Sequence, residues 1–313
     1  MEESKFYHKP VLVSEVLQYL DPKPGGVYLD VTFGSGGHTR AILEKEPTCK
    51  VIAMDWDSVV LDKYGPPLQE LFTDRLRLVW GNFSLLYKLI KSEKIPMVDG
   101  ILADFGTSQI QITERAGFSM FRDTPLDMRM SPSHQKITAE IVLRDSSEKK
   151  LVEIFSSLGE ERYSRKIAYA IVQARSARRI RTTKDLADII EKVVPKSKTE
   201  KIHPATRVFQ ALRIFVNKEL ENIESFFPVA LKLIKPSGKL VCISFHSLED
   251  RIVKDFFKSE SIVNLSPKED PLGLIKIDAR VKLINRKPIV PTEIEIRNNY
   301  RARSAKLRVA ERL

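Results

Sequence analysis

Short apolar runs alternate with longer amphipathic stretches in the first third of the chain. Four of these runs have the length and composition of buried strands, at residues 27–31, 51–55, 76–80 and 100–104. Segments long enough for helices separate them. Because strands that alternate with helices pair in parallel and are covered on both faces, the pattern predicts an α/β fold.

A helical pattern replaces this alternation after residue 112. Between residues 148 and 194, apolar side chains recur at helical spacing, as in Leu151, Ile154, Phe155 and Leu158. Thr182 and Asp185 have the spacing of an N-terminal capping box. No strand candidate interrupts this stretch, which predicts an all-helical insertion.

The last third returns to the sheet pattern. The expected elements are, in order, a long amphipathic helix through 209–223, a turn at 236–238, a strand at 239–245, a loop at 258–275, a last strand at 281–284 and a helical, strongly basic tail at 297–313. We therefore expect one discontinuous domain, 1–112 with 207–313, interrupted by a helical domain at 113–206.

Charge narrows the choice of partner. The chain has 52 basic and 41 acidic residues, a formal net charge of +11, which favours a polyanion. No apolar run approaches the roughly 18 residues of a membrane span, and the first residues, MEESKFYHKP, lack the apolar core of a secretory signal. Cys49 and Cys242 form no Cys-x-x-Cys pair. We expect a cytoplasmic protein without membrane contact and without a metal.

A glycine-rich loop follows the first expected strand and opens a helix, in the sequence DVTFGSGGH at 30–38. Gly34 and Gly36 let the backbone turn tightly and let a ligand approach the main chain. The dinucleotide fingerprint needs a third glycine where this chain has Thr39. An S-adenosylmethionine loop, with Asp30 just before the glycines, is the other interpretation.

Acidic and aromatic residues follow the next expected strands. Asp55 comes about 20 residues after the loop, where a carboxylate accepts both ribose hydroxyls in either class of enzyme. Phe83 could stack on an adenine or belong to the core. Asp104 ends the fourth expected strand, where a ligand meets its substrate, and could accept a hydrogen bond from an exocyclic amine.

At this point the chain resembles the bacterial RsmH (MraW) family, the cytosine-N4 methyltransferases of 16S ribosomal RNA. The segments that carry the resemblance run almost end to end and are HKPVLVSEVL (8–17), DVTFGSGGHT (30–39), ADFGTSQIQ (103–111), GFSMFRDTPLDMRM (117–130), GEERYSRKIAYAIV (159–172), KIHPATRVFQALRIFVNKEL (201–220), ISFHSLEDRIVK (243–254) and RARSAKLR (301–308). The chain departs from the family pattern at Thr107 and Gln109, where we expect an aliphatic residue and a serine.

The resemblance implies a Rossmann-like class I methyltransferase sheet, S-adenosylmethionine as cofactor, and an inserted helical domain that holds the RNA. It implies methyl transfer to N4 of a cytidine in the decoding region of the small ribosomal subunit. We also allow a homodimer. The cofactor residues that it implies are Gly36, Gly37, His38, Asp55, Phe83, Asp104 and Gln111. His38 could instead only pack at the helix start.

Substrate-side candidates each have a structural alternative. Asp127 and Arg129 could hold a base or phosphate, or could brace the insertion as an ion pair. The basic residues of 160–181 could bind phosphates or only form a solvated face, and those singled out are Arg162, Arg165, Arg178 and Arg179. The tail offers a second RNA contact through Arg301 and Arg303, with Arg297, Lys306 and Arg308 nearby.

His246 follows a strand and could shuttle a proton, stack on a base with Phe245, or serve as a structural hydrogen-bonding group. Its neighbouring serines lack the Gly-x-Ser-x-Gly elbow of a hydrolase.

Three other functions share parts of the pattern. An NAD-dependent oxidoreductase shares the glycine loop. A DNA amino-methyltransferase shares the chemistry, although we would expect an Asn/Asp-Pro-Pro-aromatic turn where this chain has DFGTS. A non-catalytic RNA-binding protein would keep the basic surfaces but would not need Asp30, Asp55 and Asp104.

Overall fold

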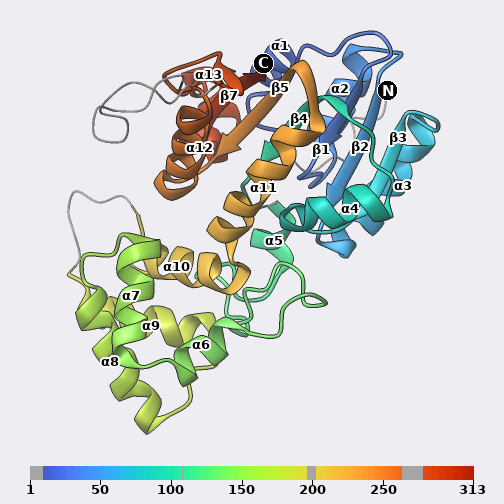
Figure 1. Ribbon diagram of the computed structural model, residues 1–313. Coiled ribbons are helices and arrows are strands. Elements are labelled where there is room, and N and C mark those ends of the chain that lie inside the picture. Colours follow the sequence, from blue (N-terminus) through green and yellow to red (C-terminus); the bar gives the residue numbers. More distant parts are fainter. Residues whose placement is uncertain (1–9, 108, 196–201, 263–277) are drawn as a thin grey trace, which may run out of the picture. The chain divides into compact units, whose positions relative to one another are not determined.

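The computed structural model describes residues 10–107, 109–195, 202–262 and 278–313. The chain forms two compact units, one made of residues 1–106 with 220–313 and the other of residues 107–219. Figure 1 shows the sheet of the first unit and the helices of the second.

The first unit is built on a seven-stranded sheet with the order β3-β2-β1-β4-β5-β7-β6. The strands are β1 (Val27–Asp30), β2 (Lys50–Asp55), β3 (Leu76–Trp80), β4 (Val98–Asp104), β5 (Ile234–Ser244), β6 (Val281–Leu283) and β7 (Lys306–Arg312). The pairs among β1 to β5 are parallel, whereas β7 is antiparallel to β5 and β6. The predicted α/β fold is confirmed.

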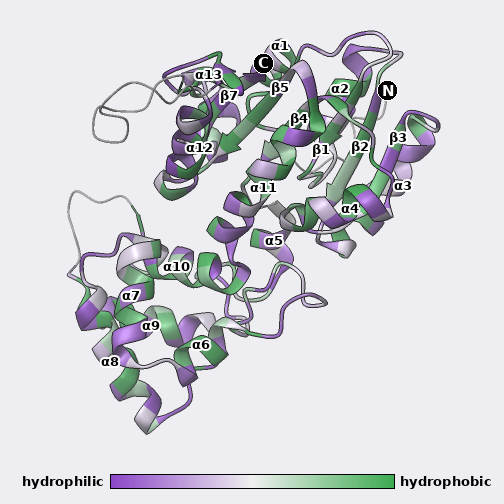
Figure 2. Ribbon diagram, viewed as in Figure 1, coloured by the Kyte–Doolittle hydropathy of each residue, from purple (hydrophilic) through white to green (hydrophobic). Residues whose placement is uncertain are grey.

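Helices cover both faces of the sheet because successive side chains of a strand point to opposite faces. The helices of this unit are α1 (Val13–Leu20), α2 (Gly37–Lys45), α3 (Ser58–Leu71), η1 (Phe83–Leu85), α4 (Leu86–Ser92), α11 (Glu219–Leu233), α12 (Ser247–Glu260), α13 (Glu293–Asn298) and η2 (Tyr300–Ser304). Phe226 and Phe227 of α11 pack with Ile101 and Ala103 on one face. Leu20 of α1 closes on Gly100 from the other, where an added Cβ would lie 2.7 Å from its Cδ1. Figure 2 shows the apolar character of the central strands.

The strand order reverses at β1, which has β2 on one side and β4 on the other. The connections after β1 and β4 therefore leave in opposite directions. Ligands of open parallel sheets bind outside the carboxyl ends of the strands at such a point. The register places Asp30, at the end of β1, beside Leu102, two residues before Asp104 at the end of β4.

The second unit is helical and has its own core. Its helices are α5 (Gln109–Glu114), α6 (Ala139–Asp145), α7 (Glu148–Gly159), α8 (Ser164–Ala177), α9 (Thr183–Val193) and α10 (Thr206–Asn217). Buried apolar side chains from α6 to α10 make one cluster that includes Phe155, Ile167 and Ile190. The predicted capping box is present, since Thr182 accepts from the Asp185 amide and the Asp185 side chain accepts from the Thr182 amide.

The expected single helix through 209–223 is wrong. It is two helices, α10 and α11, separated at Lys218, whose φ is +51°. The Asn217 side chain accepts from the Met130 amide and donates to the Met128 carbonyl, both at 2.8 Å. Val208, Phe209 and Leu212 fill the core of the helical unit, so that unit extends over 107–219 and not over the predicted 113–206.

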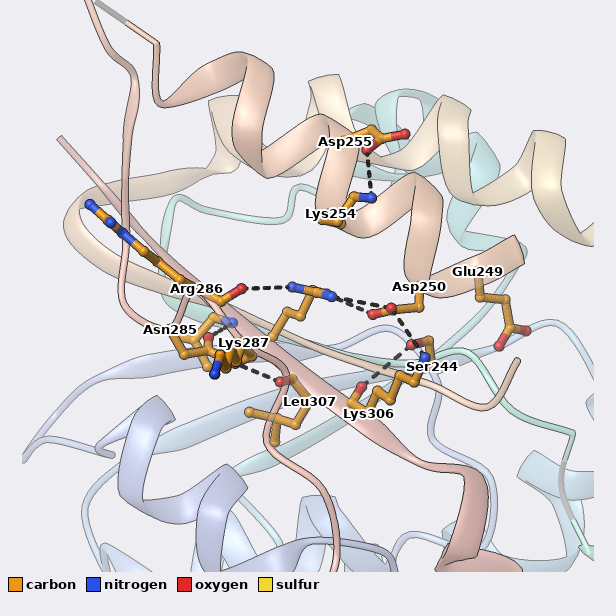
Figure 3. Close-up of polar contacts among 12 residues, drawn as sticks. Ser244, Glu249, Asp250, Lys254, Asp255, Asn285, Arg286, Lys287, Lys306 and Leu307 are labelled. Atoms are coloured by element: carbon orange, nitrogen blue, oxygen red, sulfur yellow. Dashed lines mark hydrogen bonds and ion pairs between the residues drawn. The ribbon is translucent and has the colours of Figure 1, made fainter. Parts of the chain in front are cut away.

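The expected helical tail at 297–313 is wrong in its second half. Residues 297–304 lie largely in α13 and η2, whereas residues 306–312 form β7. Leu307 and Val309 are buried there, and Arg308 reaches a buried carboxylate. Its Nε donates to Oδ1 of Asp250 at 2.6 Å and its Nη2 to Oδ2 at 3.1 Å. Lys306 also contacts Asp250. Figure 3 shows these contacts around Asp250. Arg308 and Lys306 therefore hold the fold together instead of offering free charges to RNA.

Smaller differences concern three loops. The 236–238 turn lies inside β5 as an interruption of pairing, where the register jumps from Val98↔Ile234 to Gly100↔Lys239. The expected 258–275 loop overlaps the end of α12, and residues 263–277 lie outside the described part of the chain. The 281–284 strand is β6, the last but one in chain order. Among the described residues, no helix combines the length and apolar character that crossing a membrane would require.

The Asp250–Arg308 pair yields a stability prediction. Arg308 is 7% exposed, so Arg308→Met should lower the free energy of unfolding by about 3–5 kcal/mol, because it leaves the buried Asp250 carboxylate with only the Lys306 amine, at 3.4 Å, as a cationic partner. Urea unfolding followed by circular dichroism measures it. Arg303→Met, at an exposed position of the same segment, should cost less than about 0.5 kcal/mol. Equal losses in the two variants would contradict the assignment, and Asp250→Leu combined with Arg308→Met should recover much of the loss.

Candidate functional site

The glycine loop joins β1 to α2 in a backbone conformation that favours glycine. Gly34 has φ +55°, and Gly36, which precedes the first residue of α2, has φ +79°. A Cβ on Gly36 would lie 2.9 Å from the Phe33 ring, and one on Gly37 would lie 2.8 Å from Cγ of Pro10. Gly36 and Gly37 therefore allow close packing against these two side chains, whereas a Cβ on Gly34 would meet only a backbone oxygen at 3.9 Å, so the main chain at Gly34 is the open part of the loop.

Asp30 is buried at the end of β1 and is fully engaged by its own loop. Its Oδ1 accepts from the Thr32 amide at 3.1 Å, and its Oδ2 accepts from Oγ1 of Thr39 at 2.7 Å. Burial raises the pKa of Asp30, and the Thr39 hydroxyl and the nearby His38 offset part of this effect. These bonds tie β1 to α2, so Asp30 fixes the loop.

Asp55 at the end of β2 also holds the loop but retains acceptor capacity. Its Oδ2 accepts from the Gly34 amide and its Oδ1 from the Asp57 amide, both at 2.9 Å. A carboxylate has about four acceptor positions, so two remain for a pair of vicinal hydroxyls. Burial raises the pKa of Asp55 to about 7, against these two backbone hydrogen bonds.

Asp104 at the end of β4 is the least satisfied of these carboxylates. Its Oδ1 is buried and has no hydrogen-bond partner among the described residues. Its Oδ2 lies 3.7 Å from Nδ1 of His38 on α2. Burial raises the pKa of Asp104 to about 6. His38 and, to a smaller extent, a backbone hydrogen bond from Gly106 lower it, and Asp30 and Glu249 raise it further.

His38 uses both of its ring nitrogens inside the protein. Its Nε2 lies 2.8 Å from the Val11 carbonyl, which can only accept a hydrogen, so Nε2 carries a proton. Nδ1 faces Asp104 and carries the second proton in the cationic imidazole, which is the form that lowers the pKa of Asp104. The imidazole is buried. The side chain is therefore directed at Asp104, and only the backbone of His38 is left for the predicted cofactor contact.

Two aromatic residues and one threonine complete this edge of the sheet. Phe83 is partly buried and lies 5.7 Å from the Phe105 ring and 5.6 Å from the Phe226 ring, centroid to centroid. Oγ1 of Thr32 accepts from the Asp104 amide at 2.7 Å, which links the loop to β4. Sequence reasoning missed Thr32, because a threonine before a glycine loop has no distinctive signal.

His246 is the N-cap residue of α12 and lies immediately before its first residue. Its Nδ1 accepts from the Glu249 amide at 3.4 Å, and its Nε2 lies 3.1 Å from Oε1 of Glu249. Oε2 of Glu249 in turn accepts from the Phe245 amide at 2.7 Å. This arrangement supports the structural alternative over the proton shuttle. Glu249 was missed, although its position three residues after His246 is that of a capping-box acid.

The other predicted residues of the site belong to the helical unit. Gln111 is buried on α5. Asp127 and Arg129 form a two-point ion pair, with Nε to Oδ1 at 2.7 Å and Nη2 to Oδ2 at 2.8 Å. Nη1 of Arg129 also donates to the Gln135 carbonyl at 3.0 Å. The pair thus braces its own loop, which was the structural alternative.

The predicted basic residues differ in how far the protein already uses them. Arg178 is paired with Asp185 at 3.2 Å and Arg179 with Glu140 at 2.7 Å. Arg162, Arg165 and Arg301 are exposed. Arg303 is exposed and donates to the Tyr300 hydroxyl at 2.6 Å.

A substitution tests the electrostatic link between His38 and Asp104. His38→Asn should raise the pKa of Asp104 above about 6, because it removes the group that opposes the effect of burial. Carbon-13 NMR of the aspartate carboxyl carbons against pH, with Asp104→Asn to assign the signal, measures it. Arg40→Gln removes a charge paired with Glu44 on the same helix and should leave the titration unchanged. If the pKa of Asp104 were unchanged in the His38 variant, the electrostatic interaction between the two residues would be rejected.

Comparison with known proteins identifies the family of this chain. The model of the MraW methylase family matches residues 5–313. Ribosomal RNA small subunit methyltransferase H of Geobacter sulfurreducens is 45% identical over 311 residues, covering 98% of this chain and 99% of that protein. The protein of the same name from Carboxydothermus hydrogenoformans is 44% identical over 310 residues and 99% of each chain. A solved rRNA methylase from Streptococcus thermophilus has a TM-score of 0.40 and 10% identity over 96% of this chain and 93% of that one. Because the family model and both relatives span almost the entire sequence, the chain belongs to the MraW methylase family.

Proposed function

We propose that this protein uses S-adenosylmethionine to methylate N4 of a cytidine in the decoding region of 16S ribosomal RNA. The observation that carries the proposal is the buried, unpartnered Oδ1 of Asp104 at the carboxyl end of β4. The names of the relatives, which are 44–45% identical, support a small-subunit RNA as substrate.

The loop residues fit the proposed cofactor. Asp55 would accept the two ribose hydroxyls with its remaining acceptor positions. The main chain at Gly34 is open to close approach. Gly36 and Gly37 would contact the cofactor through their backbone, and Phe83 offers an aromatic ring just after β3. The bound cofactor supplies a methyl group on a positively charged sulfur. Asp30 would act through the loop that it fixes, and membership of a methylase family disfavours the oxidoreductase alternative.

Asp104 would orient the substrate amine. An exocyclic cytosine amine has a lone pair delocalised into the ring, so holding it in the reactive orientation is the main catalytic task. Oδ1 of Asp104 can accept an N–H hydrogen bond, which aims the nitrogen. His38 lies on the Oδ2 side of the carboxylate, and the Asp104 side chain is 21% exposed, so a substrate amine can approach the carboxylate. The target base must leave its stack to reach a buried carboxylate.

The remaining site residues are assigned by their charge and position. Gln111 would contribute to the cofactor site from α5. Arg162, Arg165, Arg301 and Arg303 would contact RNA phosphates, while Asp127, Arg178 and Arg179 would support their own unit. His246 would shape the start of α12 near the catalytic strand ends. The reaction requires no metal in this proposal, its compartment would be the cytoplasm, and a homodimer is the assembly that we would test by sedimentation.

The proposed role of Asp104 is tested by measuring methyl transfer to small ribosomal subunits. Small subunits from a strain lacking the modification are incubated with the protein and S-adenosylmethionine, and N4-methylcytidine is measured by mass spectrometry after digestion. Asp104→Ala should lower kcat by about 10²–10³-fold with little change in subunit binding. The wild-type rate should fall as pH drops through about 6, because protonation of Asp104 removes the acceptor. Equal losses of rate and binding, or no N4-methylcytidine from the wild type, would reject the role.

Asp55 generates a binding prediction that needs no turnover. Affinity for S-adenosylhomocysteine, measured by calorimetry, should fall as pH drops below about 7, since the protonated carboxyl accepts fewer hydrogen bonds. Asp55→Asn should weaken binding by about tenfold or more and remove this pH dependence. Asp62→Asn, at an exposed position on α3, should behave as wild type. A pH dependence that persists in the Asp55 variant would assign it to another group.

A further inference from the structure

Helix α8 has two faces of different character. Ile167, Ala168 and Ile171 are buried in the core of the helical unit. Arg165, Lys166 and Tyr169 are exposed, as is Arg162 in the preceding turn. Arg165 and Lys166 stand four and three positions before Tyr169, the spacing that places side chains on one side of a helix, and Arg162 lies in the turn that precedes α8. We call these four residues the α8 basic face.

The α8 basic face differs from the other basic residues nearby in having no internal role. Nη1 of Arg175 donates to the Leu143 and Ser146 carbonyls at the end of α6, and Arg178 and Arg179 are ion-paired as described above. In the described part of the chain, Arg162 and Arg165 have no ion pair, and the Lys166 amine lies 5.8 Å from the Tyr163 ring centroid. Their charges are therefore available to a partner.

Acidic residues do not neutralise this face along its helix. The α8 sequence, SRKIAYAIVQARSA, contains no Asp or Glu. Of the two acids before it, Glu161 is buried and accepts from the Tyr163 amide at 2.7 Å, and Glu160 is exposed at the end of α7. The partner should consequently be an anion that contacts several cations at once.

Tyr169 indicates which polyanion fits. It is 56% exposed although it is aromatic, and it follows Arg165 and Lys166 by four and three positions on the same side of the helix. Proteins that bind single-stranded nucleic acid combine backbone-tracking cations with aromatic rings on which unpaired bases stack. Sequence-specific RNA proteins likewise target unstacked, single-stranded segments.

We propose that the α8 basic face binds a single-stranded segment of the RNA substrate, with Arg162, Arg165 and Lys166 on phosphates and Tyr169 stacked on a base. The inference rests on the proposed RNA substrate. Under this proposal, some basic residues of 160–181 bind RNA and the others stabilise the helical unit. The proposal also assigns a role to Tyr169, which the sequence pattern did not indicate.

The test uses the full chain, unmodified small subunits and a single-stranded oligouridine as the binding probe. Arg165→Gln with Lys166→Gln should raise KM for subunits while leaving kcat nearly unchanged, because these contacts position the RNA without touching the reacting atoms. The slope of log affinity for oligouridine against log salt should become shallower by about 1.4, which is about 0.7 for each lost phosphate contact. Tyr169→Ala should weaken oligouridine binding at least about fivefold without changing that slope, and Tyr169→Phe should retain binding.

Lys149→Gln with Lys184→Gln is the matched control, because it removes two exposed charges from other helices of the same unit. It should leave KM and the salt slope near the wild-type values, and thermal unfolding should show that every variant is folded. The inference would be overturned if the control changed the salt slope as much as the α8 double variant does. It would also be overturned if the α8 double variant left both KM and the salt slope unchanged, provided that the wild type makes N4-methylcytidine. The proposed function alone would be overturned if the wild type methylated nothing while the α8 variants still lost oligouridine binding. The RNA-binding role of the α8 basic face would then stand.

Discussion

Burying carboxylates at the ends of adjacent parallel strands is the constraint on which the sheet unit depends. A buried charge is costly unless hydrogen bonds or an opposite charge compensate it. Asp30 and Asp55 are compensated by the glycine loop itself, through Thr32, Thr39 and the Gly34 amide. The same bonds hold that loop in its left-handed turns. Asp104 receives no such bond at Oδ1, so the carboxylate that the fold leaves least satisfied is the one that chemistry can use.

A series of contacts connects the glycine loop to β4. Thr32 accepts from the Asp104 amide while its own amide donates to Asp30. His38 belongs to the helix that the glycine loop opens, and its ring faces Asp104 because Val11 holds the opposite nitrogen. A change in the loop would therefore reach the acceptor oxygen through two routes.

Basic residues serve two purposes in this chain, and their position in the fold separates them. Arg308 and Arg175 bind buried or terminal oxygens of the protein, and Arg129 braces a loop. Arg162, Arg165 and Arg301 remain exposed. The net charge alone predicted a polyanionic partner but not which cations would meet it. Burial and pairing decide this, since a cation already matched to a carboxylate has less to gain from a phosphate.

The sequence by itself determined the α/β class, the four amino-terminal strands, the helical character of the insertion, the glycine loop and the strand-end acids. These follow from local signals, namely apolar periodicity, glycines that permit positive φ, and polar residues that directly follow buried runs. Only the tertiary structure decided that residues 306–312 of the basic tail form a strand, because Leu307 and Val309 gain burial by pairing with β5. It also decided the break at Lys218, where Asn217 binds backbone almost 90 residues away, and the role of His38, whose partners Val11 and Asp104 lie on other elements. Such contacts join distant positions of the chain, and no local pattern of residues encodes them.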